Sequence, residues 1–80
     1  MAQKEVIIYT TPVCPFCKKL KAYLDENDIE YLEKDISMDK DAQREVIEKT
    51  DKMIAPVIDI DGEIIEGFDR TLIEEALEEG

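Results

Sequence analysis

The 80-residue sequence has no histidine and no tryptophan, and it has only two cysteines, three glycines and three prolines. A structural zinc site usually takes four Cys or His ligands, so this chain cannot complete one by itself. It also lacks any apolar run near the ~18–20 residues that a membrane-spanning helix needs. The sequence therefore predicts neither a zinc site within one chain nor a membrane span.

Basic residues are scarce, with 10 of them against 21 acidic residues and a net charge of −11. This balance disfavours nucleic acids and anionic membrane surfaces as partners. Lysines gather most densely beside the two cysteines, at Lys18, Lys19 and Lys21. Acidic residues gather near the C-terminus, and we interpret them as the solvated face of a helix: Glu74, Glu75, Glu78 and Glu79.

Length and composition predict a single small globular domain over residues 1–80, because 44% of the residues are apolar and 39% are charged. Residues 1–4 lead directly into an apolar stretch and leave no room for a signal peptide. We therefore expect the protein to lie in the cytoplasm. We also expect it to be a monomer. In a reducing compartment, two cysteines are more often catalytic or metal-binding than structural.

The hydrophobic pattern predicts seven elements in the order β-α-β-α-β-β-α. Strands are expected at 5–10, 29–35, 57–60 and 63–66, and helices at about 15–26, from a Ser37 or Asp39 cap to 50, and at 68–79. Inward-facing positions are expected on the second helix at Ala42, Val46 and Ile47, and on the third at Leu72, Ile73, Ala76 and Leu77.

The strands differ in character. The continuous apolar run at 5–10 indicates a central strand covered on both faces, and the charges within 29–35 indicate an edge strand. Asp61-Gly62 predicts a two-residue hairpin turn. The sequence thus predicts an α/β domain with a four-stranded mixed sheet and helices on both faces.

The two cysteines lie in Cys14-Pro15-Phe16-Cys17, between the first strand and the first helix. Pro15 suits the first helical turn, where its missing N–H would be unpaired anyway. Unpaired N–H groups at the helix N-terminus, together with the nearby lysines, should favour the thiolate of Cys14, which is the form that attacks disulfides. Cys17 lies one turn along, close enough to form a disulfide with Cys14, and we expect it to be half-buried and to act as the resolving thiol.

Three motifs together resemble those of the glutaredoxins: Cys14-Pro15-Phe16-Cys17, then Ala55-Pro56-Val57, then Gly67-Phe68-Asp69. The resemblance covers nearly the whole chain and is nearest to small bacterial and archaeal glutaredoxin-like proteins, close to the redoxins that serve ribonucleotide reductase. It implies a thioredoxin fold with a cis Pro56 facing Cys14. It also implies a thiol–disulfide oxidoreductase in electron transport and cell redox homeostasis, with no metal or organic cofactor and with glutathione as a possible co-substrate.

The same resemblance implies a substrate-binding groove, made by Thr11, Pro15, Phe16, Ala55, Pro56, Gly67, Phe68 and Asp69. The Ala55 backbone would pair with the substrate as a short extra strand. The N–H groups near Gly67 would hold the glutamyl carboxylate of glutathione, and Asp69 would take its ammonium group. The alternatives are an ordinary trans Pro56, core packing for Phe68 and a plain helix cap for Asp69.

Four positions depart from the family pattern. Ile54-Ala55 stands where Thr-Val is usual, Glu66 replaces the first glycine of a Gly-Gly pair, and Thr11 replaces a lysine. Because these changes reduce the positive charge that glutathione would meet, a thioredoxin reductase is an alternative reductant. The expected partners are disulfide-containing proteins.

Two functions of other classes stay open. The cysteines could supply half of an iron–sulfur or metal site shared between two chains. Alternatively, the chain could be a binding module whose thiols are inert.

Overall fold

The computed structural model describes residues 4–78. Its helices and strands are β1 (Val6–Thr10), α1 (Pro15–Glu26), β2 (Leu32–Asp35), α2 (Lys40–Thr50), β3 (Val57–Ile60), β4 (Glu63–Glu66) and α3 (Arg70–Glu78). The predicted order β-α-β-α-β-β-α is confirmed. Among the described residues, no helix is long and apolar enough to cross a membrane. Residues 1–3 and Glu79, on which two of the sequence predictions fall, lie outside the described part.

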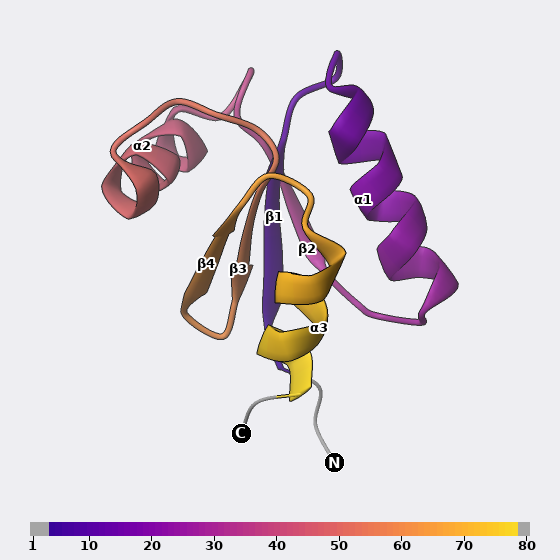
Figure 1. Ribbon diagram of the computed structural model, residues 1–80. Helices are drawn as coiled ribbons and strands as arrows, with labels where there is room; N and C mark the ends of the chain where they lie inside the picture. The colour runs from indigo at the N-terminus through magenta and orange to yellow at the C-terminus, as the bar shows by residue number, and fades with distance from the viewer. Residues whose placement is uncertain (1–3, 79–80) are drawn as a thin grey trace.

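The four strands form one mixed sheet in the order β2-β1-β3-β4. β1 is parallel to β2 and antiparallel to β3, and β3 is antiparallel to β4. Figure 1 shows α1 and α3 on one side of this sheet and α2 on the other. The predicted central first strand, the edge position of the second strand and the helices on both faces are all confirmed.

Successive side chains of β1 point to opposite faces of the sheet, so this strand contributes to the hydrophobic core on each face. Ile8 packs with Leu20 and Leu24 of α1 on one face of the sheet, whereas Tyr9 packs with Ala42 and Val46 of α2 on the other. All six side chains are fully buried. Since burying a large aliphatic side chain contributes about 1.5–3 kcal/mol, these contacts hold α1 and α2 firmly against the sheet.

The β3–β4 hairpin is closed by Asp61 and Gly62, whose φ values are 50° and 95°. Positive φ at both central residues is what a type I′ turn requires. The turn brings β4 back beside β3, so that Glu66 stands opposite Val57. The hairpin therefore returns the chain to the end of the sheet where β1 leads into α1.

The second strand begins at Leu32 and not at Ile29 as predicted. Asp28 has a φ of 55°, and the Ile29 N–H donates to the Leu24 carbonyl at 2.9 Å. This geometry is typical of a helix C-terminus, so Ile29 completes the end of α1 instead of joining the sheet.

The caps set the starts of the other two helices. Of the two predicted caps for α2, Asp39 is the one used, since its side chain accepts from the N–H groups of Asp41 and Ala42. α3 begins at Arg70, two residues later than predicted, because Asp69 caps it: the Leu72 N–H donates to the Asp69 carboxylate at 3.1 Å.

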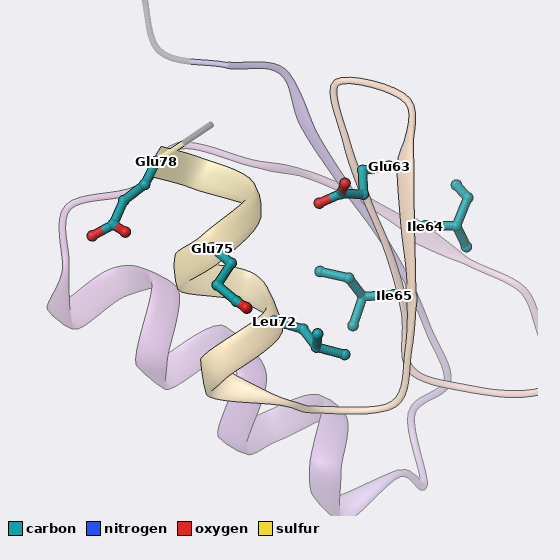
Figure 2. A pocket seen from close by; sticks show the side chains of 6 residues that line it. All are labelled: Glu63, Ile64, Ile65, Leu72, Glu75 and Glu78. Atoms are coloured by element: carbon teal, nitrogen blue, oxygen red, sulfur yellow. The ribbon is translucent and has the colours of Figure 1, made fainter. Parts of the chain in front are cut away.

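Two predicted core positions were wrong. Ile47 of α2 and Leu72 of α3 are 46% and 47% exposed, since the buried stripes of those helices run through Val46 and Ile73 instead. Leu72 points toward Ile65 across a hollow of about 520 Å³ between α3 and β4, as Figure 2 shows. None of the predicted site residues lines this hollow.

Candidate active site

Cys14 is the N-cap of α1, with extended backbone angles (φ −98°, ψ 110°), and Pro15 follows it at the first helical position. Its side chain is partly exposed. The backbone N–H of Cys17 donates to the Cys14 sulfur at 3.1 Å. One of the unpaired N–H groups of the helix N-terminus is therefore already aimed at this sulfur, where it stabilises negative charge.

Cys17 is 1% exposed, which is more buried than predicted. It lies on the face of α1 that also carries Leu20 and Leu24, and both of those are fully buried. Burial raises the pKa of the Cys17 thiol to about 12, and its hydrogen bond with Cys14 acts in the same direction. The two free thiols are thus chemically unequal, because Cys14 meets solvent and Cys17 is held in its protonated form.

The three lysines near the cysteines do not form a uniform cluster. Lys21 pairs with Glu33 of β2 at 3.0 Å, and Glu33 also accepts from the Thr10 hydroxyl at 2.7 Å. Lys19 places its ammonium 5.3 Å from the centre of the Phe16 ring, a cation–π geometry. The positive charge near the motif is therefore partly neutralised on the β2 side.

The Ala55–Pro56 peptide bond is cis, as the resemblance implied. Pro56 directly precedes β3, whose first residue Val57 stands opposite Tyr9 of β1. The Gly67 N–H donates to the Pro56 carbonyl at 2.8 Å. The start of β3 and the end of β4 thus lie at the end of the sheet where the chain leaves β1 for α1 (Figure 1).

The exposed apolar side chains in the segments near this end of the sheet fit a surface that contacts a substrate. Phe16 is 56% exposed, although Leu20 and Leu24 on the same helix are buried. The Thr11 carbonyl accepts from the Cys14 N–H at 3.4 Å and so holds the loop before the helix. Sequence reasoning missed two further exposed apolar residues, Val13 in the loop before Cys14 and Met53 in the loop before Pro56. Their positions in these loops could have predicted that they are exposed.

Phe68 and Asp69 both have the structural roles named as alternatives. Phe68 is partly buried against the core, with its ring 5.9 Å from that of Tyr23. Asp69 caps α3 through the N–H of Leu72. Core packing by Phe68 and helix capping by Asp69 are both compatible with contact to a substrate. Both residues directly follow Gly67, which lies beside Pro56 at the end of the sheet near the cysteines. Their part in glutathione binding stays a prediction.

Within residues 4–78, no group of three or more Cys, Asp or Glu side chains is placed to hold a metal ion. A cluster shared between two chains draws its ligands from both, so this finding does not bear on it. That alternative stays a prediction.

Comparison with known proteins identifies a family for most of the chain. The glutaredoxin family model matches residues 6–65, a match that ends before Gly67. A glutaredoxin-like 8.6 kDa protein in a rubredoxin operon of Clostridium pasteurianum, itself uncharacterized, is 38% identical over 71 residues, covering 89% of this chain and 95% of that protein. The solution structure of glutaredoxin from Brucella melitensis superposes with a TM-score of 0.73 at 32% identity, covering 94% of this chain and 84% of that one.

A regulator of another kind is similar over a shorter segment. The global transcriptional regulator Spx 2 of Bacillus anthracis is 39% identical over 56 residues, which cover 66% of this chain and 43% of the regulator. The family-model match and the Clostridium relative extend over most of the chain, and the fold and the two-cysteine motif agree with both. The chain belongs to the glutaredoxin family, within the thioredoxin superfamily.

Proposed function

We propose that this chain is a dithiol–disulfide oxidoreductase that reduces protein disulfides or glutathione mixed disulfides, working in the cytoplasm as a monomer. One observation carries the proposal: a partly exposed Cys14 at the N-terminus of α1 accepts a hydrogen bond from the N–H of a buried Cys17. This arrangement separates an attacking sulfur from a resolving sulfur within one helical turn.

The first step is attack by the Cys14 thiolate on one sulfur of a substrate disulfide. A mixed disulfide forms at Cys14, and the other substrate sulfur leaves as a thiolate that takes a proton from solvent. The N–H of Cys17, which holds the Cys14 sulfur in the free protein, positions it for this attack.

The second step needs the buried Cys17 thiol to lose its proton. Burial, the hydrogen bond with Cys14 and the Cys14 charge all raise the pKa of Cys17. Once Cys14 is in a mixed disulfide, its charge is gone and its sulfur is a weaker hydrogen-bond acceptor, so burial is the main effect that still opposes ionisation of Cys17. The Thr11 backbone and the Lys21 charge act in the opposite direction and lower the pKa of Cys17. Its sulfur then attacks Cys14, the reduced substrate leaves as a thiol, and the protein is left with a Cys14–Cys17 disulfide after two electrons have passed to the substrate.

The neighbouring segments are proposed to hold the substrate during both steps. The Ala55 backbone beside Pro56 would pair with an extended substrate segment, and the exposed Phe16 ring would contact it. Gly67 lies against Pro56 through its N–H, so the segment after β4 forms the other side of the same groove.

A coupled assay tests the function and identifies the reductant. The oxidised protein is supplied with NADPH and either glutathione plus glutathione reductase or thioredoxin reductase alone, with hydroxyethyl disulfide as substrate. We expect NADPH consumption that depends on the protein in at least one of the two systems and that Cys14→Ser abolishes. Absence of turnover in both, with alkylation of Cys14 no faster than that of a free thiol, would instead support a binding module with inert thiols.

A further inference from the structure

An ion pair joins Lys52 and Glu66 next to the Pro56 segment. The Lys52 ammonium lies 3.1 Å from the Glu66 carboxylate, and the side chains are 61% and 44% exposed. Glu66 is the last residue of β4 and stands opposite Val57, which directly follows Pro56. The pair therefore flanks the end of the sheet where the reaction is proposed to take place.

The charge on this side of the site is mostly negative. The segments 51–56 and 66–69 contain one lysine against three carboxylates, on Asp51, Glu66 and Asp69. The one lysine is held by Glu66. On the α1 side, by contrast, Lys18 and Lys19 are exposed. A substrate that lies along Pro56 and Gly67 thus meets no unpaired cation within these two segments.

We propose that Glu66 determines substrate charge preference, so that the disulfides this protein favours have neutral or cationic flanks and anionic disulfides are disfavoured. The inference rests on the proposed oxidoreductase function and specifies its substrate class. Glu66 acts in two ways, because it contributes a carboxylate to the groove and removes Lys52 as a binding partner for a substrate carboxylate. An exposed ion pair adds little to folding stability, so replacing either partner changes the charge of the groove without threatening the fold.

The test uses three small disulfides that differ in charge: glutathione disulfide, which is anionic, hydroxyethyl disulfide, which is neutral, and cystamine, which is cationic. Each is mixed with the reduced protein, and the second-order rate of Cys14–Cys17 disulfide formation is measured at low ionic strength. Every variant is compared through its anionic-to-neutral and cationic-to-neutral rate ratios. These ratios cancel any general change in thiol reactivity.

The variants are Glu66→Gln, Lys52→Gln, the double variant and Glu5→Gln. Glu5 is an exposed carboxylate directly before β1, at the opposite end of that strand from Thr10 and the cysteine loop. Replacing it changes the net charge by the same amount as Glu66→Gln. It therefore separates a local effect of Glu66 from an effect of the total charge.

We expect Glu66→Gln to raise the anionic-to-neutral ratio by roughly three- to tenfold and to lower the cationic-to-neutral ratio, as about one unit charge near a protein surface would. Lys52→Gln should shift both ratios the other way. The double variant, whose pair has the same net charge as the native pair, should return toward the native ratios. All of these shifts should shrink at high salt, where the Debye length is short.

Unchanged ratios in Glu66→Gln, or an equal shift in Glu5→Gln, would overturn the inference. Failure of the proposed function looks different, since the native protein would then react with none of the three disulfides faster than a free thiol does. Reaction with hydroxyethyl disulfide together with unchanged ratios would leave the oxidoreductase standing and remove only the role of Glu66.

Discussion

The backbone N–H of Cys17 donates to the Cys14 sulfur across 3.1 Å, so the two cysteines are in contact within the reduced protein. The contact follows from local structure, because Pro15 starts the helix and leaves Cys14 as its N-cap. Burial of Cys17 then makes the pair unequal. The order of the two chemical steps thus depends on which cysteine lies inside the helix and which caps it.

Cys17 should make the reduced protein less stable at alkaline pH. Its pKa is about 12 in the folded protein, above the value of about 8.5 expected for an unfolded thiol. The stability it contributes is therefore fully present below about pH 8.5 and is lost as the pH rises toward 12, with a slope of up to about 1.4 kcal/mol per pH unit. The free energy of unfolding, measured with urea between pH 7 and 10 under a phosphine reductant, should fall more steeply for the native protein than for Cys17→Ala. Parallel curves through pH 10 would show that Cys17 titrates like a free thiol.

Asp69 should have two separable roles. Asp69→Ala should lose about 1 kcal/mol of stability, because its carboxylate caps α3 at the Leu72 N–H. Asp69→Asn should keep that stability, since Asn caps as well as Asp does. If the charge also holds the ammonium of glutathione, Asp69→Asn should lower glutathione-dependent turnover by about tenfold, the loss of one charge-assisted hydrogen bond. Turnover with thioredoxin reductase should not change.

Asp39 provides the control for this experiment. It caps α2 in the same way, through the N–H groups of Asp41 and Ala42. Asp39→Ala should therefore cost a similar amount of stability, and Asp39→Asn should leave turnover in both assays unchanged. Normal glutathione-dependent turnover in Asp69→Asn would mean that Asp69 is a cap alone.

A polar network on the α2 face of the sheet should matter for stability. The Tyr9 hydroxyl donates to Glu45 at 2.6 Å and accepts from Lys49 at 2.8 Å, and Lys49 also pairs with the mostly buried Asp59. Tyr9→Phe should cost about 1 kcal/mol, because Glu45 keeps Lys34 and Lys49 keeps Asp59.

Lys49→Met should cost more than Tyr9→Phe, roughly 2–3 kcal/mol, because it leaves the Asp59 charge without its cation. Urea unfolding at pH 7 measures both variants. A smaller loss in Lys49→Met than in Tyr9→Phe would contradict the importance given to the Asp59 pair.

The sequence predicted those parts of the fold that depend on local chemistry. The bounds of α1, β3 and β4 follow from the apolar periodicity, Pro15 and the Asp61-Gly62 turn, and all three were correct. The start of β2 was wrong because Ile29 has strand-like character but bonds back to Leu24. The hydrogen bond from Ile29 to Leu24 keeps Ile29 at the end of α1, so that β2 begins only at Leu32.

The sequence predicted the main residues of the site but not the interactions that their neighbours make. Cys14 and Cys17 are recognisable from their spacing, and the cis Pro56 followed from the resemblance to a family. The pairing of Lys52 with Glu66 was not predicted, because the two residues lie 14 positions apart and meet only when the hairpin closes. The full burial of Cys17 likewise depends on how α1 packs on the sheet.

Trapping the first intermediate tests the central claim, which is that Cys14 attacks and Cys17 resolves. The reduced Cys17→Ser and Cys14→Ser variants are each mixed with hydroxyethyl disulfide at pH 7, and the intact mass of each is followed over time. We expect Cys17→Ser to accumulate one mixed disulfide at Cys14, whereas Cys14→Ser stays unmodified because its buried thiol is protonated at this pH. Equal rates of modification in the two variants, or faster modification of Cys17, would contradict the assignment.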